Sequence, residues 1–276
     1  MEELSLVSVI MPTYNGERYI EQALLSVLQQ SYPQINVFVC DDASKDQTPD
    51  LIKQIKAQHD TRNQIHLIQQ SKNQWISRNM NTGLEAANGK YVAILDQDDM
   101  RIDPDKIAKQ VLFLDKHQDH WIVWTNVIIN RYGTETNRTY PILDQNIRSI
   151  ILGTCPMLHS SVMYDKALAK TIGWYSESYK YAMDYKLFLD FMKKSKGANI
   201  QDITTYYRRH GNNTSILRSK EQQEEAKTIR IENRNDFPNR TKNMICAKTV
   251  SVLNNLFGEN ELYIKAKSEI KKRYLK

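Results

Sequence analysis

An acidic run directly after an apolar segment constrains this chain more than any other feature. Residues 91–95 form a short apolar stretch typical of a buried strand, and residues 96–99 then bring three carboxylates, those of Asp96, Asp98 and Asp99. Crowded carboxylates raise one another's pKa, so the cluster needs a cation or hydrogen-bond donors to stabilise it. Oxygen ligands of this kind suit Mg²⁺ or Mn²⁺, which bind through one or two carboxylates and substrate phosphates. The run therefore predicts a metal–phosphate site at the carboxyl end of a strand, with a solvated acidic turn as the alternative.

Strand and helix patterns alternate through the first hundred residues. Short apolar runs predict strands at 7–11, 36–40, 65–68 and 91–95. Apolar residues at helical spacing predict helices at 17–30, 48–57 and 79–87. Four strands separated by helices are typical of an α/β chain with a doubly wound, mostly parallel sheet.

After residue 99 the pattern becomes mixed. It predicts a hairpin around Tyr132 and Gly133, a strand at 203–208, and helices at 104–116, 145–152, 165–172 and 184–194. From about residue 218 the pattern is helical throughout. We therefore expect a mixed second half that packs on the first sheet without a linker, followed by a helical extension.

The cysteines and the apolar runs indicate the cellular compartment of the protein. The three cysteines, Cys40, Cys155 and Cys246, are odd in number and widely spaced, which predicts neither a disulfide framework nor a zinc site. The acidic first residues do not resemble a secretory signal, and no apolar run approaches the ~20 residues that span a bilayer. We expect a cytoplasmic protein, either free or peripheral on the inner face of the cell membrane.

The positive charge is concentrated at the end of the chain. Residues 262–276 hold six basic residues and one acidic residue, which is +5 of the formal net charge of +6. The rest of the chain is nearly neutral, and this argues against a nucleic-acid partner. A narrow apolar stripe runs through the same segment, so it is either a solvated helix or a peripheral contact with an anionic membrane.

The first two predicted strands also end in polar residues. Pro12 cannot donate a ladder hydrogen bond, so the first strand is predicted to end there and to expose Tyr14, which would stack on a base or cap the core. The second strand ends at Asp41 and Asp42, where one carboxylate can accept hydrogen bonds from a base or a ribose. Helix capping explains the polar residues that follow, but it does not explain two adjacent acids.

These strand ends together resemble the family 2 glycosyltransferases. The segments 9–15, 41–48 and 95–99 match that family in order and spacing, and the resemblance covers roughly residues 5–215. It implies a GT-A fold, a nucleotide-sugar donor, a divalent metal and inversion at the anomeric carbon. Residues 1–99 would then form the nucleotide-sugar-binding half and 100–217 the acceptor-binding and catalytic half, with 218–276 as the helical extension.

The resemblance assigns the donor to residues from all three segments. Pro12, Tyr14 and Asn15 would line the donor site, with Tyr14 stacked on the base and Asp42 hydrogen-bonded to it. In the acidic run, Asp98 would lie near the ribose. Asp99 would bind the Mn²⁺ or Mg²⁺ that bridges the diphosphate, and Asp96 would orient a metal-bound water or the donor.

A second resemblance lies between the third predicted strand and the acidic run. Asn73, Arg78 and Asn79 match a family stretch in which the arginine helps to hold the donor. The chain departs from that stretch at Trp75, where the family usually has glycine, and at Ser77, where it has alanine.

The inverting reaction also needs a carboxylate that takes the proton from the acceptor hydroxyl. Residues 181–187 resemble the family segment that carries this base, and Asp184 matches its aspartate. Met183 replaces the usual glutamate. Capping of the following helix is the alternative role for Asp184.

Residues 208–215 resemble a segment of polysaccharide rhamnosyltransferases, which favours a deoxyhexose donor. Arg209 and His210 in this segment would bind the diphosphate or complete the metal site. His159 would line the acceptor pocket or pack in the core.

The sequence thus predicts a metal-dependent inverting glycosyltransferase. The donor would be a UDP-, dTDP- or GDP-sugar, and the acceptor a surface polysaccharide or a lipid-linked glycan. One alternative is a degenerate, non-catalytic nucleotide-sugar-binding or interaction protein. A nucleotidyltransferase is the weaker alternative, because its glycine-rich basic loop is missing after the first strand.

Overall fold

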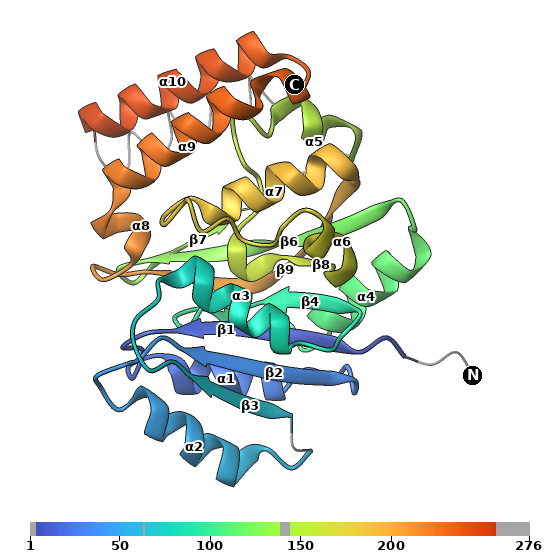
Figure 1. The fold of residues 1–276 in the computed structure, drawn as a ribbon, viewed down its shortest axis with the longest axis vertical. Coiled ribbons are helices and arrows are strands. Elements are labelled where there is room, and N and C mark those ends of the chain that lie inside the picture. The colour runs from blue at the N-terminus through green and yellow to red at the C-terminus, as the bar shows by residue number, and fades with distance from the viewer. Residues whose placement is uncertain (1–3, 63, 139–143, 258–276) are drawn as a thin grey trace.

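The computed structural model describes residues 4–62, 64–138 and 144–257 (Figure 1). Its strands lie in one sheet with the order β3-β2-β1-β4-β8-β6-β9-β5, and β7 pairs with β6 at the side. The strands are β1 (Val7–Thr13), β2 (Ile35–Asp41), β3 (Ile65–Gln69), β4 (Tyr91–Ile94), β5 (Met100–Arg101), β6 (His120–Arg131), β7 (Thr134–Arg138), β8 (Met163–Asp165) and β9 (Lys196–Arg209).

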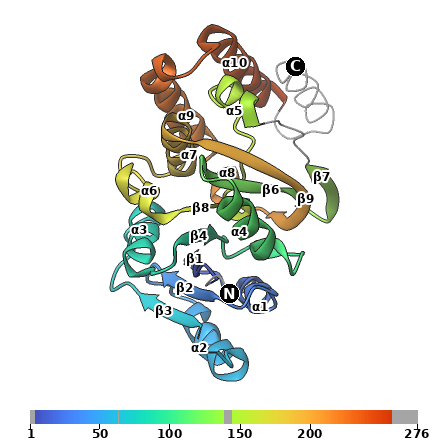
Figure 2. The ribbon, with the colours of Figure 1, turned by 90° about the vertical axis from the view of Figure 1, so that its right-hand side faces the viewer.

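Helices cover the sheet and extend beyond one end of it (Figures 1 and 2). The helices are α1 (Ile20–Leu28), α2 (Thr48–His59), α3 (Ile76–Ala86), α4 (Lys106–Lys116), α5 (Asp144–Ile150), α6 (Lys166–Thr171), α7 (Met183–Lys194), α8 (Thr214–Leu217), α9 (Ser219–Asn233) and α10 (Arg240–Phe257). Two short 3₁₀ turns occur at His159–Ser161 and Arg234–Asp236.

The first half is the predicted parallel α/β unit. β1 pairs in parallel with β2 and β4, and β2 pairs in parallel with β3. Alternate residues of a strand point to opposite faces, so Ile10 packs in the apolar cluster that contains α3 and α7. Val9 packs in the cluster that contains α1, α2 and α4. Both faces are therefore covered, which explains why these strands are apolar along their whole length.

The prediction that β1 ends at Pro12 is wrong by one residue. Pro12 pairs with Cys40, and the strand continues to Thr13, which pairs with Asp41. The Ile10 carbonyl accepts a hydrogen bond on the side of β4, and the pairing of β1 with β4 ends at Ile94. The backbone N–H position of residue 12 points to the same side as that of residue 10. The N–H that Pro12 lacks would therefore have no partner strand to bond.

The second half is a mixed sheet. β8 runs antiparallel to both β4 and β6, whereas β9 runs parallel to β6 and antiparallel to β5. The β6–β7 hairpin at Tyr132 and Gly133 is confirmed. β9 is longer than the predicted strand, and its pairing with β6 shifts register near Asn126. The short strands β5 and β8 had no sequence pattern of their own to predict them.

The helical extension packs on the second half. α9 lies along α7, and α10 lies beside α9 (Figure 1). None of the helices in the described part of the chain is long and apolar enough to cross a membrane. The basic segment 262–276, for which a membrane contact was one expectation, lies outside the described residues.

Candidate active site

Asp42 connects the end of β2 to the loop before α3. Its Oδ1 accepts the backbone N–H of Gln74 at 2.7 Å, and its Oδ2 accepts that of Trp75 at 3.0 Å. Burial raises the pKa of Asp42, while these two hydrogen bonds act in the opposite direction. Each oxygen keeps a further lone pair that can accept a hydrogen bond from a ligand.

The same loop explains one departure from the family pattern. Trp75 has a φ of +71°, the left-handed conformation that glycine adopts at little cost. The backbone path of a glycine is thus retained with a tryptophan, whose side chain is 52% exposed beneath the Lys180 ammonium. Arg78 is exposed on the first turn of α3, and Asn79 is buried and donates to the Cys40 carbonyl.

The end of β1 is held by a residue that the sequence did not single out. Gln97 Oε1 accepts the Thr13 hydroxyl at 2.7 Å and the Tyr14 N–H at 2.8 Å. The ring of Tyr14 remains 43% exposed, as stacking on a base requires. Asn15 has a φ of +50°, and its Oδ1 accepts the N–H of Lys45. Pro12 itself is buried in the sheet, so it supports the loop rather than lining it.

Asp98 meets the segment that follows β9. Its Oδ2 lies 3.0 Å from Nε2 of His210 and accepts Nδ2 of Asn213 at 2.8 Å. The His210 ring stacks on Tyr19, with 4.9 Å between the ring centroids. The side chains of Asp98 and His210 are 18% and 21% exposed, so an ion could reach both. His210 therefore lies directly beside the acidic run.

Asp99 has a different environment from its neighbour. It is fully buried, with Oδ1 accepting the Arg208 N–H at 3.0 Å and Oδ2 accepting the Ser160 hydroxyl at 2.5 Å. Burial raises its pKa well above the usual value, and Asp98 and Asp96 add to the effect. These contacts tie β9 and the 159–161 turn to the acidic run. An ion bound to Asp99 would have to share or displace these hydrogen bonds.

Asp96 is hydrogen-bonded to a histidine 63 residues further along the chain. His159 Nδ1 lies 2.9 Å from Asp96 Oδ1, and its Nε2 lies 2.8 Å from the Tyr175 hydroxyl. Burial alone would lower the pKa of His159, but the Asp96 carboxylate raises it above the usual value. The sequence predicts that His159 either lines the acceptor pocket or packs in the core. The structure places it at the acidic run.

Asp184 lies in the first turn of α7, close to this group. Its Oδ1 accepts the Tyr185 N–H at 2.7 Å. Burial raises the pKa of Asp184. The nearby charge of His159 lowers this pKa and that of Asp96 raises it, so the three groups lie within electrostatic reach of one another. A raised pKa suits a carboxylate that must accept a proton.

The segment before α7 is held by the helical extension. Glu225 of α9 accepts the consecutive backbone N–H groups of Lys180, Tyr181 and Ala182 at 3.0, 2.8 and 2.9 Å. Lys180 and Tyr181 precede α7, and Ala182 is its N-cap residue, so Glu225 fixes the segment that leads into the helix. Asp184 itself accepts a first-turn N–H, that of Tyr185, so the capping role remains open beside the role of base.

A cavity of about 380 Å³ opens beside Asp98 and His210. It is lined by Arg18, Tyr19, Asn130, Tyr132, Gly133, Tyr206, Arg208, Arg209, His210 and Gly211. Arg209 and His210, both expected to bind the diphosphate, thus share one cavity. Its cationic lining suits an anionic ligand.

Within the described residues, no group of three or more histidines, cysteines and acids is arranged to hold a metal. The Asp98–His210 pair nevertheless fits Mg²⁺ or Mn²⁺. These ions commonly take one or two protein ligands and complete their shell with phosphate and water oxygens. Carboxylate oxygens suit both ions, whereas imidazole suits softer divalent ions than Mg²⁺, so a site that includes His210 favours Mn²⁺.

The fold and this acidic strand-end site define a sugar-transferring enzyme of the GT-A class, and comparison with known proteins identifies the family. The family model described as "Glycosyl transferase family 2" matches residues 8–174. The chain belongs to this family and is a glycosyltransferase.

Two curated relatives cover most of the chain. An "Uncharacterized glycosyltransferase" of Haemophilus influenzae is 32% identical over 248 residues, covering 84% of this chain and 74% of its own. The Escherichia coli "UDP-Glc:alpha-D-GlcNAc-diphosphoundecaprenol beta-1,3-glucosyltransferase WfaP" is 30% identical over 225 residues, covering 79% of this chain and 83% of its own.

Solved structures share the fold at lower identity. S. aureus TarS 1-349 in complex with UDP-GlcNAc has a TM-score of 0.71 at 23% identity, with 98% of this chain and 78% of that one covered. The Pyrobaculum calidifontis mannosyltransferase PcManGT, in complex with GDP-Man and Mn²⁺, has a TM-score of 0.65 at 17% identity, with 99% and 85% covered. The predicted GT-A fold is thus confirmed.

Proposed function

We propose that the protein is a metal-dependent inverting glycosyltransferase that elongates a surface polysaccharide or a lipid-linked glycan. The observation that carries this proposal is the position of Asp184 within electrostatic reach of His159 and Asp96. The candidate base and the acidic run come from distant parts of the chain, yet the charge of Asp96 influences Asp184. A carboxylate beside the donor site is what attack by an acceptor hydroxyl requires.

The metal ligand we propose is Asp98, with His210 as a second ligand, rather than Asp99. Asp98 is partly exposed and contacts His210, whereas Asp99 is enclosed by Arg208 and Ser160. A bound Mg²⁺ or Mn²⁺ would supply positive charge that stabilises the departing diphosphate. Arg209, which lines the adjoining cavity, would add a second positive charge there.

The donor and acceptor classes follow from the site together with the relatives. Tyr14 would stack on the base and Asp42 would hydrogen-bond to it, while Arg78 would reach the donor from α3. The name of the E. coli relative includes a UDP-sugar and a diphosphoundecaprenol glycan, and the S. aureus neighbour binds UDP-GlcNAc. We therefore favour a UDP-sugar donor and a lipid-linked acceptor, which would bring the enzyme to a membrane face.

Asp184 performs the proton transfer in this proposal. The acceptor oxygen attacks the anomeric carbon while Asp184 takes the hydroxyl proton, and the bond to the diphosphate oxygen breaks on the opposite face of the sugar. His159 holds Asp96 through a charge-assisted hydrogen bond, so the acidic run keeps its position. Tyr175 holds the other ring nitrogen of His159 and fixes the ring orientation.

Thermal-shift binding of UDP-, dTDP- and GDP-sugars, with Mn²⁺ and with EDTA, tests the donor part of the proposal. We expect one base to stabilise the protein only when metal is present. The same donors are then incubated with a diphosphopolyprenol glycan acceptor, and the anomer of the product is determined. Binding without transfer would instead support a non-catalytic nucleotide-sugar-binding protein, and absence of binding by all three would contradict the proposal.

A further inference from the structure

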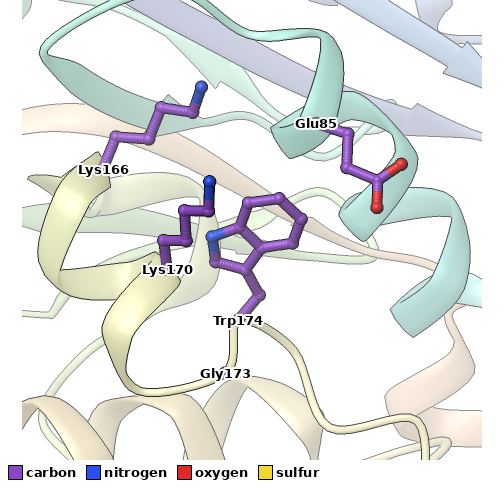
Figure 3. Close-up of a pocket in the computed structure, with 5 residues that line it drawn as sticks. All are labelled: Glu85, Lys166, Lys170, Gly173 and Trp174. Carbon is purple, nitrogen blue, oxygen red and sulfur yellow. The ribbon is translucent and has the colours of Figure 1, made fainter.

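A cavity of about 460 Å³ lies between α3 and α6 (Figure 3). It is lined by Glu85 of α3, by Lys166 and Lys170 of α6, and by Gly173 and Trp174, which follow α6. α3 begins near Asp42, and Glu85 lies nine residues further along it, roughly 13 Å along the axis. None of the proposed donor, metal or base residues lines this cavity.

Three nitrogen donors share one side of the cavity. In Figure 3 the ammonium groups of Lys166 and Lys170 and the indole nitrogen of Trp174 lie on one side, and Glu85 projects from α3 on the other side. The indole N–H is buried and has no hydrogen-bond partner among the described residues. Both lysines also lack an ion-pair partner within the described part of the chain, although Lys166 donates to the Ala87 carbonyl.

The two ammonium groups affect each other. Burial lowers the pKa of Lys166, and the positive charge of Lys170 lowers it further. Like charges brought together beside a buried, unpaired N–H are costly unless an anion joins them. An oxyanion would accept hydrogen bonds from all three groups.

The backbone holds the indole in place. Gly173 and Trp174 have φ values of +92° and +56°, and the latter is unusual for a residue with a side chain. Asn81 of α3 bonds both backbone polar atoms of Tyr175, the next residue, at 2.9 and 3.0 Å. The indole therefore presents a fixed apolar surface next to the three donors.

We propose that this cavity binds an acidic sugar unit, with its oxyanion between Lys166, Lys170 and the Trp174 N–H, and its ring against the indole. The Glu85 carboxylate, on the opposite side, accepts hydrogen bonds from sugar hydroxyls. The oxyanion is a carboxylate, as in a hexuronate, or a phosphate ester. The statement that the ligand is part of a glycan substrate rests on the proposed function. The binding of an acidic sugar to the cavity does not.

The site is also connected to the active site. Trp174 precedes Tyr175, whose hydroxyl contacts His159, which in turn contacts Asp96. A ligand that contacts Trp174 therefore acts on a segment that also positions His159. We expect occupancy of the cavity to lower KM for an acidic acceptor without changing donor affinity.

Titration of the full chain with glucuronate, glucose 6-phosphate and neutral glucose tests the proposal, with calorimetry and tryptophan fluorescence as readouts. We expect at least one of the two acids to bind and glucose to bind at least about tenfold more weakly, since it lacks the charge-assisted hydrogen bonds. The tighter acid identifies the oxyanion. Failure of both acids to bind, or equal binding of glucose, overturns the proposal.

Variants locate the binding. K166M/K170M should weaken binding of the preferred acid at least about tenfold. K53M/K56M, which removes two positive charges from α2, should leave it unchanged. W174F should remove most of the fluorescence response and weaken binding. Equal losses in both lysine double variants would indicate a general charge effect and refute the site.

Metal-dependent binding of a nucleotide sugar is measured on the same variants and should be retained. If the wild type binds a nucleotide sugar but neither acid, only the cavity proposal fails. If it binds an acid but no nucleotide sugar, only the proposed function fails.

Discussion

Glu225 accepts the backbone N–H of Ala182 at 2.9 Å, two residues before the candidate base Asp184. The same carboxylate also accepts the N–H groups of Tyr181 and Lys180. These three residues lead directly into α7, whose N-cap is Ala182, and one carboxylate of α9 holds all three N–H groups. The helical extension therefore positions the catalytic helix in addition to packing against it.

Replacement of Glu225 by alanine tests this role. We expect E225A to lower the free energy of unfolding by about 2 kcal/mol, because its charge-assisted hydrogen bonds to the three N–H groups that lead into α7 are lost. Transfer should slow while donor binding persists. E224A is the matched control, since Glu224 is exposed and its ion pair among the described residues is with the neighbouring Lys227. Chemical denaturation and initial rates measure both effects, and equal behaviour of the two variants would contradict the role.

Replacement of Asp184 by asparagine separates catalysis from stability. D184N should keep metal-dependent donor binding and lose transfer. Because burial raises the pKa of Asp184, the ionised carboxylate is disfavoured in the fold, so the neutral amide should leave the melting temperature unchanged or raise it. Transfer at the wild-type rate would remove the assignment of Asp184 as base.

The pH dependence follows from the same raised pKa. The base acts when ionised, so kcat/KM should fall as the pH drops through a value above the usual aspartate pKa of about 3.9. The folded state binds this proton more readily than the unfolded chain. The contribution of Asp184 to stability is therefore present at low pH and decreases as the pH rises through the folded pKa. A rate profile with its acidic limb at the ordinary value would disagree with this.

Isosteric variants test which of the adjacent residues Asp98 and Asp99 binds the metal. D98N should abolish the Mn²⁺-dependent thermal shift by nucleotide sugar. D99N should retain it, because an amide can still accept the Arg208 N–H and hydrogen-bond to Ser160. The opposite result would assign the metal to Asp99.

Trp75 provides a test of backbone strain. W75G and W75A both remove the exposed indole and its contact with Lys180, but only glycine adopts a φ of +71° at little cost. We expect W75G to be more stable than W75A by roughly 1 kcal/mol. Equal denaturation midpoints would show that the loop relaxes to another conformation.

Much of the donor side of the site could be predicted from the sequence. Apolar strands that end in polar residues place Tyr14, Asp42 and Asp98 at one edge of a parallel sheet, and this requires only local patterns and the geometry of the fold. The family resemblance implied that His210 belongs to the donor site, but its contact with Asp98 was not predicted. The hairpin at Tyr132 followed from its turn residues.

Other relationships depend on contacts that no local pattern encodes. The contact of His159 with Asp96 joins residues 63 positions apart, and that of Ser160 with Asp99 joins residues 61 apart. Glu225 is one of four glutamates in α9, and no local pattern distinguishes it from the others. The burial of Asp99 could not be inferred because adjacent strand-end residues point in different directions. Pro12 lies within β1 because the pairing with the neighbouring strand β4 ends before it. This depends on the tertiary structure and not on the local sequence.

The position of β9 has a consequence for biosynthesis. Tyr206 pairs with Met100 on one side and with Ile128 on the other, so the last strand to be translated inserts between two much earlier ones. A nascent chain that stops before β9 has Asp98 but neither His210 nor the backbone N–H that holds Asp99. Pairings over such sequence separations form late and slowly. The growing polypeptide should therefore acquire nucleotide-sugar affinity only after residue 213 has left the ribosome.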